Sequence, residues 1–452
     1  MNFYAQSALL PDGWAHQVRL CVKDGRFSEV VCDAAAEPQD EKISWVIPGV
    51  CNAHSHAFQR ALAGHTEQRS PEGRDSFWTW RERMYALAGQ TGPAALTAFA
   101  RQVYCEMLAA GYTSVVEFHY LHRNPASRNG PATADTMFDA LAAAADDSGI
   151  RLTYVPVHYE RAGFAEEQPE PRQAQFHLTI EDFLEHQQRV AASGRVSVGI
   201  GAHSLRAVAP ASLEKIVAVV EQSEIPMHIH VAEQRREVEQ CVAASGLRPA
   251  QWLCDHFAVN HRWSLVHATH LDDEEVESVA ASGAAVVLCP TTEANLGDGL
   301  FRLPEYLEAG GRLAIGSDSH VSINPFEELR WLEYGQRLQQ QERNVVFGRQ
   351  RHVGQALYER AVDGGGVAAG SGPAGIAVGA PADLVVLDPN NSMLIGHDTD
   401  TCLDALVFSG YPLPVDRVMS GGTWQVRDGQ HRIAPHARAE YAAAVHTIKW
   451  SP

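Results

Sequence analysis

The chain has 452 residues, enough for one large core with an appendage, and 45% of them are hydrophobic. Its formal net charge of -19 argues against nucleic acid and anionic membrane surfaces as partners, because both repel an acidic protein. No apolar run approaches the ~20 residues that cross a bilayer and no secretion signal opens the chain, so we expect a cytoplasmic protein.

The first 46 residues predict several short antiparallel strands. Apolar and polar residues alternate there, and turn signals stand at residues 11–13 and 23–25. The same texture returns after residue 379, with strand-like runs at 384–387, 405–408, 417–419 and 423–427. We therefore expect residues 1–46 and 379–452 to pair into one small β-sandwich domain built from both chain termini.

Residues 47–378 alternate strand-like runs with amphipathic helical stretches. Such repeated βα units predict a parallel sheet, and eight of them close a (β/α)8 TIM barrel. We place the barrel strands near 45–50, 113–118, 152–157, 197–202, 226–231, 264–268, 284–289 and 312–316. Active sites of such barrels lie at the carboxyl ends of the strands, so the polar residues that follow these runs are the site candidates.

Two connections of the predicted barrel have distinctive compositions. Residues 75–85 lie in the long loop after the first strand, and their Asp75 start and apolar spacing predict a capped helix. This helix would overhang the mouth of the barrel. Residues 364–372 are rich in glycine and predict a flexible connection before the last strands.

Histidines and an aspartate follow three of the predicted strands in an order that suits a metal ion. His54 and His56 lie just past the first strand, where the two-residue period of extended chain points both imidazoles the same way. His230 ends the fifth strand and Asp318 follows the eighth. Three nitrogens and a carboxylate suit one Zn2+ ion, with Fe2+ as the alternative. The sequence therefore predicts a hydrolytic site, in which the ion lowers the pKa of a bound water from ~16 towards ~7.

Proton handling at this site falls to residues beside the ligands. Glu233 stands three residues after His230 and is the candidate general acid that delivers protons to a leaving nitrogen. His267 ends the sixth strand and is the candidate for polarising the attacking hydroxide, while Asp318 serves as ligand and base. His228 lies one residue pair deeper than His230, so we assign it to packing around the site.

The chain resembles the amidohydrolase superfamily, in its mononuclear deaminase branch. Four motifs carry this resemblance: His54-x-His56, His230-x-x-Glu233, His267 and Asp318. The runs 56–60 (His-Ala-Phe-Gln-Arg) and 76–81 (Ser-Phe-Trp-Thr-Trp-Arg) are similar to those of the formiminoglutamate deiminases of bacterial histidine degradation. Binuclear members bridge two metals with a lysine late in strand four, and no lysine lies between Lys42 and Lys215, so we expect a single ion.

The resemblance also implies the residues of a substrate pocket. These are Gln59, Arg81, Tyr120, His203 and Arg206. Formiminoglutamate carries two carboxylates and an amidine-like head, so its pocket needs at least one arginine that makes bidentate contact with a carboxylate. Arg81 and Arg206 lie on the first and fourth predicted loops and suit that role, whereas Tyr120 and His203 suit a wall of the pocket equally well.

By this resemblance we expect metal-bound hydroxide to attack the formimino carbon of N-formimino-L-glutamate, with release of N-formyl-L-glutamate and ammonia. The residues alone leave open a release of formamide and glutamate, because both outcomes start from one intermediate. An aminohydrolase of an aromatic base, of the guanine or cytosine type, would use the same metal site with an apolar, amide-rich pocket. A catalytically silent barrel that serves in assembly is a further alternative, although it has no need of a complete ligand set.

The expected partners are few. We expect a small dicarboxylate substrate and a second copy of the chain, because barrels of this size commonly form symmetric homodimers.

Overall fold

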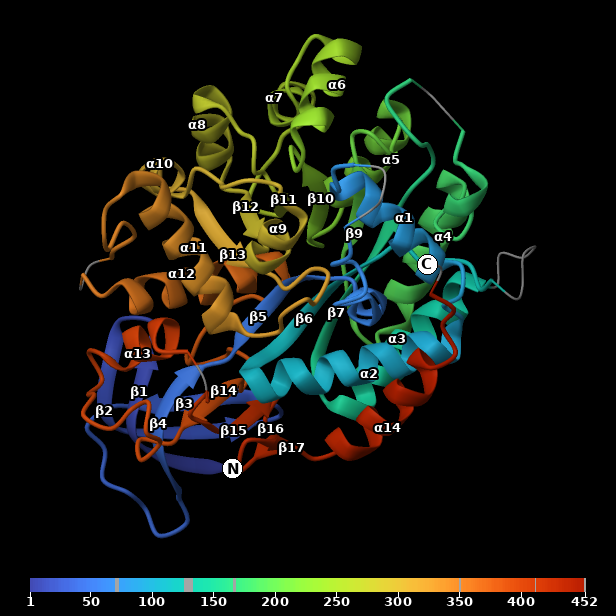
Figure 1. The fold of residues 1–452 in the computed structure, drawn as a ribbon. Helices are drawn as coiled ribbons and strands as arrows, with labels where there is room; N and C mark the ends of the chain where they lie inside the picture. Colours follow the sequence, from blue (N-terminus) through green and yellow to red (C-terminus); the bar gives the residue numbers. More distant parts are fainter. Residues whose placement is uncertain (70–72, 126–132, 166–167, 349–350, 411, 451–452) are drawn as a thin grey trace.

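Two separate sheets organise the chain, and the computed structural model describes residues 1–69, 73–125, 133–165, 168–348, 351–410 and 412–450. One sheet is a nearly closed parallel barrel surrounded by helices, and the other is built from the two chain termini at one side of it (Figure 1). The predicted fold class, a TIM barrel with a small β domain from both ends of the chain, is confirmed.

The barrel strands follow one another in chain order around the sheet. They are β5 (Val50–Ser55), β6 (Tyr112–His119), β7 (Arg151–His158), β9 (Ile200–Ser204), β10 (Met227–Val231), β11 (Trp263–His267), β12 (Ala285–Leu288) and β13 (Arg312–Ile315), with β8 (Ser197–Val198) added beside β7. A parallel bridge between Ser55 and Asp318 brings the last strand back to the first. Gly316 permits this approach, because a Cβ there would lie 2.8 Å from backbone atoms of His54.

The prediction of the first barrel strand at 45–50 is wrong. Residues up to Pro48 belong to β4 (Glu41–Pro48) of the terminal sheet, and the barrel begins with Val50 after the junction at Gly49. The end of β4 (46–48) and the start of β5 (50–51) are both apolar and buried, so local composition does not mark the boundary between them. A Cβ on Gly49 would collide with the Thr113 side chain, which explains a glycine between the two sheets. His54 therefore lies within a strand, and only His56 lies past its end.

The terminal sheet is continuous, in the order β17-β16-β15-β14-β4-β1-β2-β3. Its members besides β4 are β1 (Asn2–Leu10), β2 (Gly13–Lys23), β3 (Arg26–Val31), β14 (Leu384–Leu387), β15 (Val415–Ser420), β16 (Thr423–Arg427) and β17 (Gln430–His431). β14 lies antiparallel between β4 and β15 and so joins the two ends of the chain. The sheet curls over its own core, because the ring of Phe3 on β1 packs edge-on against Trp424 on β16 at 5.6 Å.

Helices connect the barrel strands and surround the barrel (Figure 1). They are α2 (Pro93–Ala110), α3 (Thr133–Ser148), α4 (Ile180–Ser193), α5 (Pro210–Glu221), α6 (Arg235–Ser245), α7 (Pro249–His256), α8 (Asp273–Ser282), α9 (Pro290–Leu296), α10 (Leu303–Glu308), α11 (Pro325–Gln340) and α12 (Val353–Ala368). Among the described residues, none of the helices has the length and apolar character to cross a membrane.

Two C-terminal segments differ from their predictions. The run at 405–408, predicted as a strand, belongs to the helix α13 (Cys402–Phe408). Residues 379–452 were assigned to the small β domain, but α14 (Ala434–Val445) packs along α2 of the barrel (Figure 1). The tail beyond α14 continues to the first barrel loop, where the ring of Trp450 stacks on His65 at 4.0 Å.

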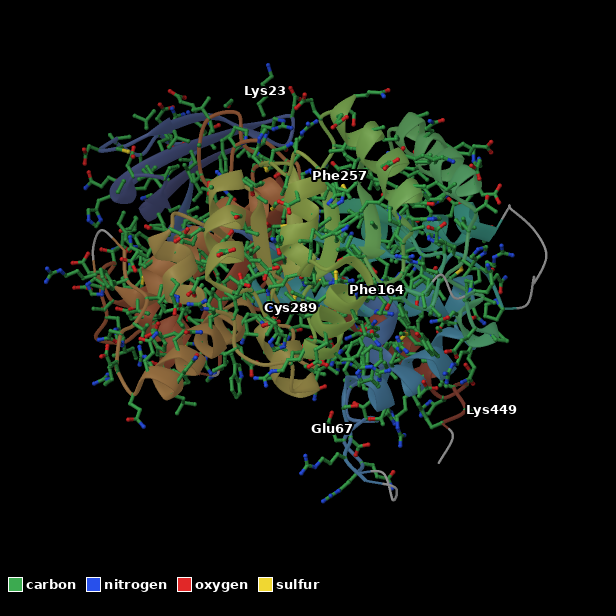
Figure 2. All side chains as sticks on the ribbon, turned by 90° about the horizontal axis from the view of Figure 1, so that it is seen from above. Lys23, Glu67, Phe164, Phe257, Cys289 and Lys449 are labelled. Carbon is green, nitrogen blue, oxygen red and sulfur yellow. The ribbon has the colours of Figure 1, made fainter. Side chains whose placement is uncertain are left out.

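The helix predicted over 75–85 is α1 (Phe77–Ala88), and its N-terminal capping residue is Ser76 and not Asp75. The Ser76 hydroxyl accepts a hydrogen bond from the backbone N–H of Trp78, and the Ser76 N–H donates to the hydroxyl of Thr79. The segment around Glu67, which precedes α1 in the chain, projects from the body of the molecule (Figure 2). The inner face of α1 covers the carboxyl end of the barrel and lines the cavity described below.

The glycines at 364–366 lie inside α12, so the predicted flexible connection at this point is wrong. α12 packs against β13 and β5 at close range. A Cβ on Gly364 would collide with the carbonyl oxygen of Leu313, and one on Gly365 would lie 2.9 Å from Cβ of Cys51. These glycines serve close packing of a helix on a sheet.

Gly364→Ala is therefore expected to destabilise the protein by about 3 kcal/mol or more, since neither the strand nor the helix can withdraw from a backbone collision. In an exposed helix the same change stabilises by about 1 kcal/mol. Thermal unfolding by calorimetry measures the difference, with Glu359→Ala on the exposed face of α12 as the matched control. An unchanged or higher midpoint for Gly364→Ala would contradict the packing described.

Candidate active site

A cavity of about 40 Å³ lies at the carboxyl end of the barrel beneath α1. It is lined by His56, Gln59, Phe77, Trp80, Arg81, Met84, Tyr85, Tyr120, Tyr159, Phe176, His203, Arg206, His230, Glu233, His267, Leu296 and Asp318. Every residue predicted for the site is in this set except His54, whose imidazole directly contacts those of His56 and His230. The structure thus brings all the predicted residues together.

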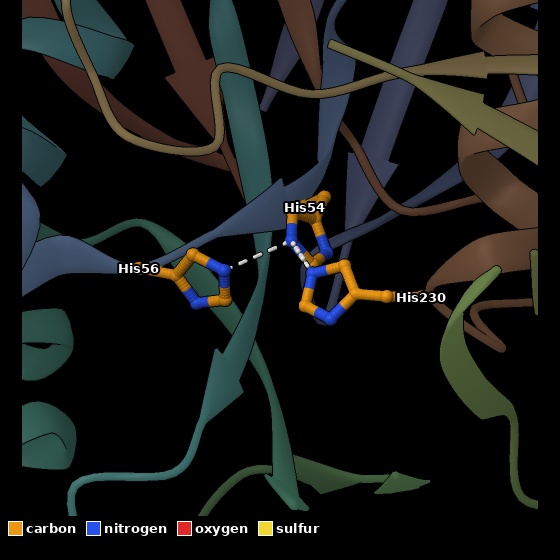
Figure 3. A group of neighbouring side chains, drawn as sticks. All are labelled: His54, His56 and His230. Carbon is orange, nitrogen blue, oxygen red and sulfur yellow. Dashed lines mark hydrogen bonds between the residues drawn. The ribbon is translucent and has the colours of Figure 1, made fainter. Parts of the chain in front are cut away.

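Three imidazoles converge on one point at the floor of the cavity (Figure 3). Nε2 of His54 lies 3.1 Å from Nε2 of His56 and 3.1 Å from Nε2 of His230. Oδ1 of Asp318 lies 3.3 Å from Nε2 of His56 and 3.7 Å from Nε2 of His54. Nitrogens bound to one zinc ion at about 2.0–2.1 Å stand at similar separations from one another, so the four side chains have the spacing of a ligand set.

The tautomers of two histidines are fixed by backbone carbonyls. Nδ1 of His56 lies 2.8 Å from the carbonyl oxygen of Phe118, and Nδ1 of His230 lies 2.9 Å from that of His203. A carbonyl oxygen only accepts, so both Nδ1 atoms carry the proton and both Nε2 atoms present lone pairs to His54. One proton on His54 can satisfy only one of them. The donor set therefore fits a cation, which would satisfy all three nitrogens at once.

Burial keeps these histidines neutral. It lowers the pKa of His56 to about 3, and it lowers the pKa values of His54 and His230 well below their usual range. Burial also raises the pKa of Asp318 to about 6, against the opposing effect of His267. Neutral imidazole is the form that binds a metal, and a bound cation would favour the charged form of the aspartate.

His267 stands between the predicted acid and the aspartate. Its Nε2 atom lies 3.8 Å from Oε1 of Glu233 and 3.7 Å from Oδ2 of Asp318. Burial opposes a charge on this imidazole, but the neighbouring carboxylates, Glu233 first, outweigh it and raise the pKa of His267 to about 10. Burial raises the pKa of Glu233 to about 7, so this carboxyl can take up and release a proton near neutral pH.

Two buried glutamates that hold the site in place were not predicted. Oε1 of Glu293, on α9, lies 3.1 Å from Nδ1 of His267 and accepts the N–H of Cys289 at 2.8 Å. The carboxylate of Glu237, on α6, accepts the N–H groups of Ala232 and Glu233 at 3.3 and 3.0 Å. Both lie on helices that follow the strands, four or five residues after the N–H groups whose hydrogen bonds they accept, so a search for polar residues at strand ends does not find them.

The predicted substrate residues form the upper wall of the cavity. Nε2 of Gln59 donates to the hydroxyl of Tyr120 at 2.7 Å. Nε and Nη1 of Arg81 and Nη1 of Arg206 are buried and have no hydrogen-bond partner among the described residues. Unpaired guanidinium N–H groups beneath α1 are donors for an anionic ligand.

His228 lies outside this cavity, as its assignment to packing predicts. Its Nε2 atom lies 2.8 Å from the carbonyl oxygen of Ala368 at the end of α12. Tyr85, Tyr159 and Phe176 line the cavity but were not predicted. Tyr159 comes directly after β7, so the position that identified Tyr120 after β6 could have identified it too.

Comparison with known proteins gives one consistent result. The amidohydrolase family description matches residues 45–425, and that of the N-terminal domain of the formimidoylglutamate deiminase HutF matches residues 1–44. The chain is 46% identical to formimidoylglutamate deiminase of Pseudomonas aeruginosa, over 95% of each chain. It is 29% identical to a 5-methylthioadenosine/S-adenosylhomocysteine deaminase of Halobacterium salinarum, over 78% of this chain and 75% of that one. The crystal structure of an amidohydrolase from Brucella melitensis superimposes with a TM-score of 0.94 at 42% identity, over 99% of both chains.

Proposed function

Because this chain belongs to the amidohydrolase family, and within it to the formimidoylglutamate deiminases, we propose that it hydrolyses N-formimino-L-glutamate to N-formyl-L-glutamate and ammonia. The observation that carries the proposal is the pairing of a metal ligand set with unpaired arginine donors in one cavity. The ligand set suits hydrolysis, and the arginines suit a substrate with carboxylates. The deaminases of adenine compounds are more distant relatives.

We propose that His54, His56, His230 and Asp318 hold one divalent cation, with Zn2+ favoured by three nitrogens and one oxygen and Fe2+ as the alternative. When bound, such a cation acts as a Lewis acid and lowers the pKa of a coordinated water to ~7.

The first proton step belongs to Glu233. Its carboxyl group lies at the edge of the cavity with a pKa of about 7. It takes the first proton that water loses on adding to the formimino carbon and delivers it to the terminal nitrogen, which becomes an NH2 group. The second proton, from the hydroxyl group of the tetrahedral intermediate, passes through Asp318 to the same nitrogen, which leaves as ammonia as the C=O bond forms. His267, charged and held by Glu293, donates from Nε2 towards the oxygen that becomes negative in this intermediate. Arg81 and Arg206 bind the carboxylates and so place the formimino carbon.

Incubation of the zinc-loaded protein with N-formimino-L-glutamate tests the proposal, with ammonia, N-formylglutamate and formamide measured in the same sample. We expect ammonia and N-formylglutamate in equal amounts. Formamide with glutamate would keep the substrate and reject the leaving group. No turnover by metal-loaded protein would reject the substrate.

Arg81→Ala separates a dicarboxylate substrate from an aromatic base. Loss of a charge-assisted, bidentate contact in a buried site is expected to lower kcat/KM for N-formimino-L-glutamate by about 100-fold. Steady-state kinetics measures this, with Arg189→Ala on the exposed side of α4 as the control. An aromatic base makes no such contact, so an unchanged kcat/KM would favour the alternative deaminase.

A further inference from the structure

A buried glutamine lies behind two tyrosines of the cavity wall. Nε2 of Gln173 donates to the hydroxyl oxygen of Tyr85 at 3.0 Å and to that of Tyr159 at 2.8 Å. The side chain of Gln173 is fully buried and does not itself line the cavity. Its Oε1 atom accepts the backbone N–H of Glu170 at 2.8 Å. Since a backbone N–H only donates, this bond fixes which end of the amide faces the tyrosines.

The orientation of the Gln173 amide determines where the hydroxyl hydrogens of Tyr85 and Tyr159 can point. Both amide hydrogens of Gln173 are used, and each phenolic oxygen accepts one of them. A hydroxyl group that accepts from Gln173 cannot donate to the same nitrogen, so its own hydrogen points elsewhere. No acceptor for either hydroxyl is found among the described residues. The hydroxyl hydrogens of Tyr85 and Tyr159 are thus oriented and free to donate to a ligand.

Both donors stand beside the unpaired arginines. The guanidinium carbon of Arg81 lies 5.4 Å from the ring centre of Tyr85, on the same helix α1. The ring of Tyr159 packs edge-on against His203 at 4.7 Å, three residues before Arg206 in the chain. Arg206 is 94% buried and its Nη1 atom has no partner. Two hydroxyl donors and two guanidinium groups at one end of a cavity form a site for a carboxylate.

We propose that Tyr85 and Tyr159 bind one carboxylate of the substrate together with Arg81 and Arg206, and that Gln173 is a positioning residue that aims both hydroxyls. This inference rests on the proposed function for the identity of the substrate. It assigns to the two tyrosines a part in specificity, because donors left unpaired in a buried site discriminate against a ligand without the matching acceptor.

The test compares three substrates that differ only in their carboxylates. They are N-formimino-L-glutamate, N-formimino-L-norvaline, which lacks the side-chain carboxylate, and 4-(formiminoamino)butanoate, which lacks the α-carboxylate. Tyr85→Phe and Tyr159→Phe are each expected to raise KM for N-formimino-L-glutamate about tenfold and to change kcat less than about threefold. For one of the two monocarboxylates the effect on KM disappears. Equal losses on all three substrates, or a loss confined to kcat, would overturn the proposal.

Gln173→Glu tests the positioning role without removing a tyrosine. A carboxylate at this place accepts from both hydroxyls and so turns their hydrogens away from the cavity. We expect the same rise in KM as in the double variant Tyr85→Phe/Tyr159→Phe, and no further rise when Gln173→Glu is added to that double variant. Additive losses would show that Gln173 acts through something other than the two hydroxyls and would overturn its role.

Tyr154→Phe is the matched control. Tyr154 is a buried tyrosine on β7 whose hydroxyl lies 3.0 Å from Nε2 of His186, outside the cavity. The Tyr154→Phe variant loses one buried hydrogen bond, as the test variants do, and its KM is expected to match that of the unchanged protein. Thermal unfolding confirms that each variant is folded.

Calorimetric binding of N-formyl-L-glutamate separates failure of this inference from failure of the proposed function. Dicarboxylate binding that weakens in the Tyr→Phe variants, in a protein without turnover, would keep the carboxylate site and reject the reaction. If Tyr85→Phe, Tyr159→Phe and Gln173→Glu all leave turnover and binding unchanged, the carboxylate site is rejected and the reaction is kept.

Discussion

Glu233→Gln is expected to lower kcat by about 10³-fold while the metal content and the binding of N-formyl-L-glutamate stay unchanged. The amide has nearly the shape of the carboxyl group but neither takes up nor releases a proton near neutral pH, and general acid–base catalysis is worth about 10²–10⁴ in rate. Its carboxyl group lies 3.8 Å from His267 and outside the set of three histidines, so it is not needed to hold the ion. Stopped-flow or steady-state kinetics on protein with measured metal content gives the result.

Glu239→Gln provides the control for this change. Glu239 lies on the exposed face of α6, six residues after Glu233, and its substitution is expected to leave kcat unchanged. If Glu233→Gln retains most of its kcat, Glu233 takes no part in the proton steps, and Asp318 becomes the candidate for proton transfer.

His56→Ala is expected to lose the bound metal and to lower kcat below about a thousandth of its value. Two histidines and one aspartate remain, so the proposed set loses one of its three nitrogen ligands and holds the ion more weakly. Addition of a chelator should also affect the stability of the two proteins differently. In the unchanged protein a chelator exposes imidazole lone pairs 3.1 Å apart and lowers the midpoint of thermal unfolding. In His56→Ala one of the facing lone pairs is gone, so a chelator should change the midpoint little.

Elemental analysis and calorimetry with and without chelator measure both effects. His228→Asn is the control, because His228 is a buried barrel histidine on the same strand as His230 but bonds to Ala368. It is expected to cost stability and to retain the metal. A His56→Ala protein that keeps one ion per chain would show that His56 is not a ligand.

The parts of the fold that the sequence predicts are those with a repeating signal. Seven of the eight barrel strands were placed near their observed positions, because each is an apolar run followed by a polar residue. The first barrel strand was misplaced, because the buried end of β4 at Pro48 is followed by β5 of the other sheet with only Gly49 between them. The residues next to that glycine, 46–48 and 50–51, are apolar and buried on both sides, and the pairing of β4 with β1 and β14 places it in the other sheet. The prediction for the glycines of α12 was wrong for a related reason, since the residues that they contact lie on β5 and β13, far away in the chain.

The residues of the candidate site also fall into two groups, those that the sequence predicts and those that it does not. The residues at strand ends could be predicted, because the barrel gathers all strand ends at one face. Glu293 and Gln173 could not, because an α-helix and a short 3-10 helix (Pro171–Gln173) carry them and no periodicity relates these segments to the strands. Both are recognised only by the hydrogen bonds they make, to His267 and to the two tyrosines.

The place of β14 in the terminal sheet has a consequence for synthesis of the protein. Leu384 on β14 pairs with Pro48 on β4, 336 positions earlier in the chain. A ribosome adds about 5–20 residues per second, so roughly 20 to 70 seconds pass between the appearance of the two strands. During that time β4 has no partner on one side, and an apolar strand with an open edge is a template for pairing with other chains. The yield of folded protein from a cell therefore depends on how many nascent chains are close together in that interval.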